Sequence, residues 1–245
     1  MNRSKIKRTI VSLFLLGAIL FTIPLGAMAN TPSFPFTDVP QNHWARAYII
    51  SVHAEGIMTG VTATSFEPNT NLSRAMAVTT LFRMYHGRIA NANDSRANPF
   101  TDVTTNNWFA PYVTWAYQND IVNGVGGNRF APLDNLTREQ FAVILFRFAE
   151  FEDVNTSVPA TFNLNSFADQ GQISSWATAA MRFATYNGIL QGATATTLNP
   201  GGHTTRAQGA ALLYRFLDFA GGHIEDVSAG KEEEYETETA DAYVA

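Results

Sequence analysis

The sequence predicts a mostly α-helical body built from three copies of one unit. The chain matches itself at a shift of 64 to 68 residues, which indicates an internal repeat. Each copy reads as a helix, a turn, an extended piece and a second helix, with apolar residues recurring at spacings of three and four. A unit of about 50 residues buries too little surface to be stable alone, so we expect the three copies to pack together.

Residues 1–29 read as a secretory signal. A basic start is followed by an apolar run from Thr9 to Gly26 and by the small-x-small cleavage pattern Ala27-Met28-Ala29. The alternative is an uncleaved membrane anchor, because a run of about 18 residues reaches the lower limit for spanning a bilayer. Pro24 and the Ala-x-Ala ending favour cleavage. No later segment is long and apolar enough to span a membrane, so we expect no span in the mature chain.

The composition excludes several classes of function. The 245 residues include no cysteine, which excludes disulfides, thiolate zinc sites and a cysteine nucleophile. The signal carries four of the sixteen basic residues and none of the twenty-one acidic ones, so the mature chain is acidic and no nucleic-acid partner is expected. Residues 221–245 are rich in acidic side chains, and we predict that they form a disordered tail.

Short motifs align the three copies. Each copy has an aspartate in a Phe-x-Asp motif, then a tryptophan, a turn that ends in glycine, and an arginine after Ser or Thr. These residues are Asp38, Trp44, Gly60 and Arg74; Asp102, Trp108, Gly124 and Arg138; and Asp169, Trp176, Gly192 and Arg206. The arginine comes 14 residues after the glycine in every copy, and 36, 36 and 37 residues after the aspartate. We place the repeats at residues 34–87, 98–150 and 165–220, joined by polar linkers.

The helix starts are predicted by local chemistry. The first helix of each copy should begin near its tryptophan, and in copy two an apolar stripe joins Trp108, Tyr112, Trp115 and Ala116. The second helix should begin at Ser73, Thr137 or Thr205, each a good N-cap. Gln140 and Gln208 occupy the reciprocal position of a capping box, and Met76 in copy one does not satisfy it. The apolar face of the second helices comprises Ala77, Leu81 and Met84, then Phe141, Leu145 and Phe148, then Ala211, Leu212 and Phe216.

The arginine is the most informative residue of each copy. It follows the N-cap, where the helix dipole disfavours a cation by about 0.3 to 1 kcal/mol. The same helix start should hold unsatisfied backbone N–H groups that point outward, which with a guanidinium make an anion site. The alternative is a salt bridge within each unit, such as Arg74 to Asp38, and the two interpretations can coexist. Every lysine or arginine between Asn30 and Gly230 is an arginine, whose planar fork suits carboxylate or phosphate.

The other repeated residues have a functional and a structural interpretation. The tryptophans either stack on a sugar ring or anchor the core. The glycines supply a turn with positive φ, and their lack of a side chain would also let a ligand approach. The aspartates read most simply as cap or turn residues. None of the five histidines recurs in register, and no nucleophile or phosphate-loop motif stands in a suitable context, so we expect no enzyme, cofactor or metal.

The motifs Ser73-Arg74-Ala75, Thr137-Arg138-Glu139 and Thr205-Arg206-Ala207 resemble the T-R-A-E motif of S-layer homology (SLH) domains, and the resemblance extends over nearly all of residues 34–220. It implies a pseudo-trimer of three prongs around a central bundle of the second helices. It also implies ligand grooves between the prongs that bind secondary cell-wall polysaccharide, often pyruvylated. A pyruvate ketal is a carboxylate, so the three arginines would take the acidic group. The tryptophans and turn glycines would shape the sugar pocket.

The sequence departs from this family pattern in two ways. No copy has glutamate as the fourth motif residue, and copy three has one extra residue near Gln170-Gly171-Gln172 and Thr204 where Leu72 and Leu136 stand in the other copies. The groove of copy three is therefore the one least expected to bind. We expect a secreted, non-catalytic protein of the cell wall, in which Arg74→Ala with Arg138→Ala abolishes wall binding and leaves the thermal melt nearly unchanged. The alternatives are an extracellular protein-interaction scaffold with structural arginines and a small wall-degrading enzyme; a surface-protein partner stays unknown.

Overall fold

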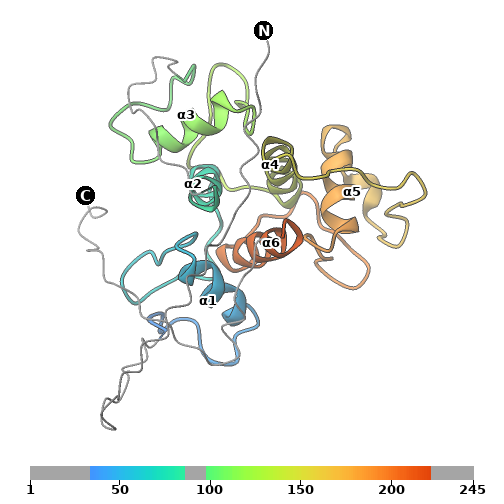
Figure 1. Cartoon of the computed structure of the whole chain (residues 1–245), viewed down its shortest axis with the longest axis horizontal. Coiled ribbons are helices and arrows are strands. Elements are labelled where there is room, and N and C mark those ends of the chain that lie inside the picture. Colours follow the sequence, from blue (N-terminus) through green and yellow to red (C-terminus); the bar gives the residue numbers. More distant parts are fainter. Residues whose placement is uncertain (1–33, 86–97, 222–245) are drawn as a thin grey trace, which may run out of the picture. The chain divides into compact units, whose positions relative to one another are not determined.

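The computed structural model describes residues 34–85 and 98–221 of the chain (Figure 1). In order, the elements are α1 (Arg46–Ala54), α2 (Arg74–Met84), α3 (Ala110–Gln118), α4 (Arg138–Phe151), the 3₁₀ helices η1 (Gln170–Gln172) and η2 (Ser175–Ala177), α5 (Thr178–Tyr186) and α6 (Arg206–Phe219). Each copy thus contributes two α-helices, and the described residues form no β-strand. The mostly helical fold is confirmed. The predicted signal and the predicted acidic tail beyond Gly221 lie outside the described residues.

The second helices begin where the capping chemistry predicts. Thr137 and Gln140 form a reciprocal capping box at the start of α4, and Thr205 and Gln208 do the same for α6. In copy one, the Ser73 hydroxyl accepts the N–H of the methionine at the N3 position at 3.2 Å, and no reciprocal bond forms because a thioether chain has no oxygen to accept it. The predicted apolar faces of all three second helices are buried. Local sequence therefore decides where these helices start and which side faces inward.

The first helices begin two residues after the tryptophans, at Arg46, Ala110 and Thr178. This position changes the predicted stripe of copy two. Ala116 is fully buried and Trp115 packs against the rings of Phe82 and Tyr85, with ring centroids 5.2 and 5.6 Å apart. Trp108 lies ahead of the helix and is exposed, so it does not belong to the stripe. The spacing predicted the helix correctly but extended its apolar face too far.

The copies interlock in a cyclic order. Helix α3 of copy two packs against α2 of copy one, α5 of copy three packs against α4 of copy two, and α1 of copy one packs against α6 of copy three (Figure 1). Each first helix therefore covers the second helix of another copy. One hydrophobic cluster runs through all three copies as a result. This arrangement explains how units too small to be stable alone form a common core.

A closed ring of backbone hydrogen bonds joins the residues that precede the three N-caps. Leu72 N–H donates to the carbonyl of Thr204 at 2.8 Å, Thr204 N–H donates to Leu136 at 2.9 Å, and Leu136 N–H donates to Leu72 at 3.0 Å. These residues occupy equivalent positions in the repeat, so the ring follows its approximate threefold symmetry. It places the starts of α2, α4 and α6 next to one another.

The side chains near this ring do not follow the symmetry. The fourth residue of each second helix is Ala77, Phe141 or Gly209, a small, a large and an absent side chain at equivalent positions. A Cβ added to Gly209 would lie 3.1 Å from Leu72 Cδ2, and the Phe141 ring would be 3.9 Å away. Three identical large side chains would compete for one central space, so unequal residues at this position allow dense packing.

Thr204→Val is expected to stabilise the protein by about 1 kcal/mol, because the Thr204 side chain carries a buried polar atom with no partner. Thr204 is fully buried, and its Oγ1 makes no hydrogen bond within the described residues. Valine keeps the shape and removes the desolvated hydroxyl, while the backbone bonds of the ring remain. The denaturation midpoint in urea should rise with an unchanged slope. A lower midpoint would mean that the hydroxyl is satisfied in solution.

Candidate functional site

The three helix-start arginines reach from one copy into the next. Arg74 of copy one donates from Nε to the carbonyl oxygen of Phe130 at 2.7 Å and from Nη2 to that of Asn123 at 3.1 Å, both in copy two. We call this place junction 1–2. Junctions 2–3 and 3–1 repeat the pattern: Arg138 donates to Leu198 (2.7 Å) and Gln191 (2.6 Å), and Arg206 donates to Phe66 (2.8 Å) and Thr59 (2.8 Å). Each guanidinium thus binds two carbonyl groups of a neighbouring copy.

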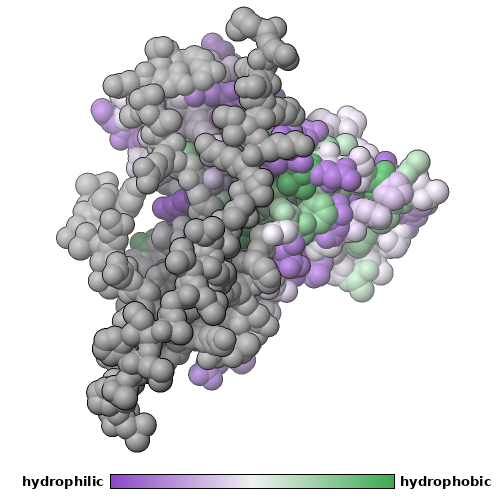
Figure 2. Space-filling view, viewed as in Figure 1, coloured by the Kyte–Doolittle hydropathy of each residue, from purple (hydrophilic) through white to green (hydrophobic). Residues whose placement is uncertain are grey.

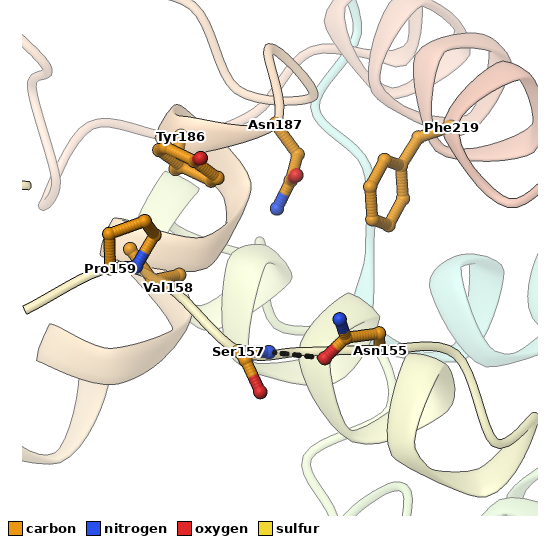
Figure 3. A pocket seen from close by; sticks show the side chains of 7 residues that line it. All are labelled: Asn155, Ser157, Val158, Pro159, Tyr186, Asn187 and Phe219. Atoms are coloured by element: carbon orange, nitrogen blue, oxygen red, sulfur yellow. Dashed lines mark hydrogen bonds between the residues drawn. The ribbon is translucent and has the colours of Figure 1, made fainter.

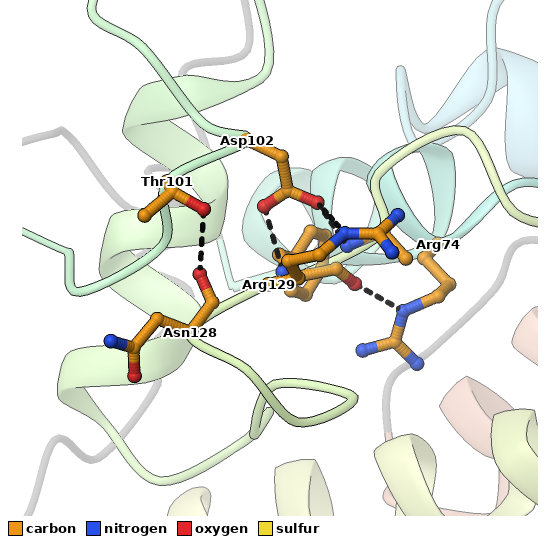
Figure 4. A network of polar contacts seen from close by, with 7 residues as sticks. Arg74, Thr101, Asp102, Asn128 and Arg129 are labelled. Atoms are coloured by element: carbon orange, nitrogen blue, oxygen red, sulfur yellow. Dashed lines mark hydrogen bonds and ion pairs between the residues drawn. The ribbon is translucent and has the colours of Figure 1, made fainter.

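The aspartates hold the loops that carry these carbonyl groups. Asp102 accepts the backbone N–H of Phe130 through Oδ1 and that of Ala131 through Oδ2, both at 2.8 Å. Phe130 therefore bonds Asp102 through its N–H and Arg74 through its carbonyl. Figure 4 labels Asp102 and Arg74 at this junction. Asp38 and Asp169 hold the equivalent loops of copies one and three in the same way. The aspartate of one copy and the arginine of the preceding one thus act on a single loop.

The proposed salt bridge within one unit is therefore wrong. Arg74 interacts electrostatically with Asp102 and Asp134 of copy two, and Asp38 instead faces Arg206 of copy three. Among residues 34–85 and 98–221, no carboxylate forms a direct ion pair with any of the three arginines. Burial lowers the pKa of each guanidinium, and the nearby acidic groups only partly offset this effect. Each junction holds a buried cation whose Nε and Nη2 groups donate to neutral oxygens.

The helix starts do not present the free N–H groups that the sequence suggested. The N–H of Arg74 donates to the carbonyl of Asp134 at 3.0 Å, and that of Ala75 donates to the carbonyl of Pro132 at 2.9 Å. The N–H of Met76 donates to the hydroxyl of the N-cap residue Ser73. The other two helix starts are satisfied in the same way by loops of the next copy. An anion would therefore have to bind the guanidinium edge. In Arg74 and Arg138, the Nη1 nitrogen makes no hydrogen bond to described residues. In Arg206, Nη1 lies 3.9 Å from Met76 Sδ.

The turn glycines are needed for space and not for positive φ. Gly60, Gly124 and Gly192 have ordinary φ angles, so the predicted positive φ is wrong. A Cβ on Gly60 would lie 2.3 Å from the carbonyl oxygen of Thr62, and the other two glycines are equally crowded. The positive φ angles fall four residues earlier, at Gly56, Asp120 and Gly188, which end the first helices. The residue before each crowded glycine supplies the carbonyl that accepts Nη2 of an arginine.

The tryptophans lie on the surface. Trp44, Trp108 and Trp176 are 58, 48 and 57% exposed, so they do not anchor the core. Their indole faces remain available to a sugar ring, although no hydrogen bond or ring contact joins them to the arginines in the described part of the chain. Trp44 stacks on His43 with ring centroids 6.0 Å apart. Exposed tryptophan at an equivalent place in three copies is unusual for a residue with a purely structural role.

The sequence interpretation missed the loop on which aspartate and arginine meet. Its members are Phe66-Glu67-Pro68, Phe130-Ala131-Pro132 and Leu198-Asn199-Pro200. The middle residue has φ of 57, 57 and 52° in the three copies, a left-handed conformation held by the aspartate. The guanidinium carbons of Arg74 and Arg206 also lie 4.7 and 4.5 Å from the ring centroids of Phe130 and Phe66. The repeated x-Pro step, which begins 29 or 30 residues after each aspartate, was the available signal.

The aspartate bonds predict that stability falls in acid. Burial alone would raise the pKa of Asp102, but the N–H bonds of Phe130 and Ala131 outweigh it, and the pKa lies below its ordinary value. The pKa values of Asp38 and Asp169 are lowered by the same kind of bonds. A carboxyl group with a lowered folded-state pKa binds fewer protons when folded. Its contribution is therefore complete above about pH 4, the unfolded value, and is lost as the pH falls through the folded pKa.

We accordingly expect the urea midpoint to decrease steadily below about pH 4. Asp102→Asn should reduce this pH dependence, because asparagine offers one acceptor oxygen and no charge. Glu150→Gln, an exposed carboxylate on α4, serves as the matched control and should leave the curve unchanged. A wild-type midpoint that stays constant to about pH 2 would contradict the role assigned to the aspartates.

An open pocket of about 500 Å³ is lined by residues that make none of the junction contacts, and Figure 3 shows their side chains. Tyr186 and Asn187 at the end of α5, Phe219 at the end of α6 and the segment 155–159 surround it. No charged side chain lines this pocket. The surface of copy three mixes hydrophobic and hydrophilic residues in Figure 2. It holds none of the residues that the sequence singled out. In the described part of the chain, no three histidine or acidic side chains gather as a metal site, and no helix has the length and hydropathy to cross a membrane.

Comparison with known proteins finds one family. The model of the S-layer homology domain matches residues 35–77, 99–142 and 166–210. An endoglucanase of Bacillus sp. (strain KSM-635) is 30% identical over 222 residues, 89% of this chain and 23% of that protein. An amylopullulanase of Thermoanaerobacterium thermosulfurigenes is 30% identical over 186 residues, 76% of this chain and 10% of that protein. An S-layer protein of Bacillus thuringiensis subsp. finitimus is 26% identical over 196 residues, 80% of this chain and 23% of that protein.

This chain spans less than a quarter of the length of these relatives. The family model matches more than half of this chain, and two of these relatives are named as enzymes and one as an S-layer protein. The names of the enzymes describe proteins several times longer than the segment that each shares with this chain.

Proposed function

We propose, from the premise that this chain belongs to the S-layer homology domain family, that its junctions bind an acidic secondary cell-wall polysaccharide, with a pyruvate ketal as the acidic group. SLH domains are non-catalytic modules that anchor cell-surface proteins to the cell wall. The chain is accordingly a protein of the cell surface, associated with the S-layer. The proposal concerns the ligand and the residues that bind it.

The observation that carries the proposal is the state of the three arginines. Each is 5 to 7% exposed, and its Nε and Nη2 donate to neutral carbonyl oxygens. A buried cation with no direct anionic partner among the described residues is costly unless another charge compensates it. A ligand carboxylate at the Nη1 edge would supply that charge through a charge-assisted hydrogen bond. In this proposal Arg74, Arg138 and Arg206 take the acidic group.

The neighbouring residues would then shape the sugar site. The exposed tryptophans Trp44, Trp108 and Trp176 offer flat faces on which a sugar ring can stack. The aspartates and turn glycines would act indirectly, because they hold the loops against which the guanidinium groups are fixed. The alternative function is a protein-interaction scaffold. The hydrogen bonds from the arginines to the next copy favour it, because they give the arginines a structural role that needs no ligand.

Binding to purified wall sacculi tests the proposal. We expect the wild-type chain to bind intact sacculi and to lose binding when the secondary polysaccharide is removed chemically. Trp44→Ala with Trp108→Ala should weaken binding at least about tenfold, because stacking is lost at two junctions. Both side chains are exposed, so the thermal melt should not change. Tyr186→Ala removes another exposed aromatic side chain and should bind like the wild type.

The opposite results are equally informative. Retention on sacculi that lack the polysaccharide would contradict the glycan proposal and favour a protein partner in the wall. Release of glycan fragments from the sacculi would contradict the non-catalytic role of this chain.

A further inference from the structure

The three junctions differ at the residue that follows the arginine. This residue is Ala75 at junction 1–2, Glu139 at junction 2–3 and Ala207 at junction 3–1. Alanine offers neither charge nor a side-chain acceptor. Glu139 is 8% exposed and places a carboxylate at the start of α4. Junction 2–3 is thus the one of the three with an acidic side chain at this position.

The Glu139 carboxylate is bound by copy three. Its Oε2 accepts the backbone N–H of Ser174 at 2.9 Å, and its Oε1 accepts the Ser174 hydroxyl at 2.8 Å. Ser174 is the N-cap of η2, and α4 packs against η2. The bridge therefore connects the residue next to Arg138 with the residue two positions before Trp176. The corresponding residues of the other copies, Asn42 and Asn106, are exposed.

This inference rests on the proposed function and narrows it: we infer that Glu139 closes junction 2–3 to acidic glycans, so that Arg138 takes no ligand and the protein binds at junctions 1–2 and 3–1. The bridge joins the residue next to Arg138 to the segment that leads into Trp176, so it lies beside the two groups that a glycan at this junction would contact. The bridge engages both donors of Ser174, and its negative charge repels a ligand carboxylate at short range.

The copy-three insertion fits this inference. Residues Gln170–Gln172 form η1, and the segment continues through Ser174 into η2, an arrangement that neither of the other copies has in the described residues. In this longer segment Ser174 contacts Glu139 at the start of α4. Glu139 of copy two and Ser174 of the longer copy-three segment therefore act together, although they lie 35 residues apart in the sequence.

Titration calorimetry with a soluble hexoside that carries a 4,6-linked pyruvate ketal tests the inference. We expect the wild type to bind two molecules per chain and Glu139→Ala to bind three. Glu150→Ala removes an exposed carboxylate from the same helix and should leave two sites. Three sites in the wild type, or two in a folded Glu139→Ala variant, would overturn this inference alone. A wild type that binds none would overturn the proposed function and this inference with it.

A second measurement on the wild type does not depend on the folding of a variant. The indole N–H resonances of Trp44 and Trp108 should shift during the titration, and that of Trp176 should stay in place. A shift of the Trp176 resonance equal to the other two would mean that junction 2–3 is open, and would overturn the inference.

Discussion

Arg74→Ala should lower the free energy of unfolding by about 3 kcal/mol, because it removes two hydrogen bonds from a charged group and leaves buried carbonyl oxygens without donors. The acceptors are the carbonyl groups of Phe130 and Asn123 in the next copy, at 2.7 and 3.1 Å. The guanidinium also covers the Phe130 ring. The change therefore weakens the contact between two copies and not only one helix. Urea denaturation followed by circular dichroism measures the loss.

Arg129→Ala is the matched control at the same junction. Its side chain is 61% exposed and lies 3.7 Å from Asp102, an arrangement that contributes about 1 kcal/mol or less. If Arg74→Ala and Arg129→Ala both lower the free energy of unfolding by the same small amount, the structural role of Arg74 is contradicted. The expectation from sequence alone, that loss of Arg74 and Arg138 leaves the melt nearly unchanged, is reversed by these contacts. A loss of wall binding in an arginine variant therefore has to be compared with the free energy of unfolding of the same variant.

Gly60→Ala is expected to destabilise the protein by about 3 kcal/mol, since the new methyl group has no room and its nearest neighbour is backbone. Its Cβ would lie 2.3 Å from the carbonyl oxygen of Thr62, 2.5 Å from Phe36 Cε1 and 2.8 Å from the carbonyl oxygen of Ser65. Relief of this overlap requires the turn to move away from Phe36. The residue before Gly60 provides the carbonyl that binds Arg206, so the movement would also disturb junction 3–1.

Gly171→Ala provides the comparison for this variant. Gly171 lies in η1 with an ordinary φ, and a Cβ there would meet no atom within 4 Å. The change should be neutral or slightly stabilising, because alanine reduces the entropy of the unfolded chain. If Gly60→Ala is as mild as Gly171→Ala, the turn adapts, and the close packing assigned to it is wrong.

Much of the fold could be predicted from local sequence. The threonine and glutamine of the capping boxes fixed the starts of α4 and α6, because capping depends on groups within four residues. The apolar faces of the second helices followed from helical spacing. Trp108 was misplaced because hydrophobicity does not distinguish a residue inside the helix from one just ahead of it. The role of Gly60 was predicted wrongly because a crowded position and a position with positive φ both select glycine.

The candidate site depends on contacts that spacing does not specify. Asp38 precedes Arg74 by 36 residues and Asp102 follows it by 28, so the sequence offered two similar partners, and the aspartate of the same repeat was the wrong one. The free N–H groups expected at the helix starts were a property of an isolated helix. In the folded chain, carbonyl groups in the loop of the next copy accept these N–H groups.

The sequence by itself determined the three repeats, the family to which they belong, the residues that start each second helix and the positions of the arginines. These features are local, or they recur at a fixed period, and a linear pattern records both. Only the tertiary structure decided that each arginine serves the next copy, that the tryptophans face solvent and that Glu139 meets Ser174. Cyclic packing of first helices on the second helices of other copies brings these residues together, and no regular spacing along one chain encodes that exchange.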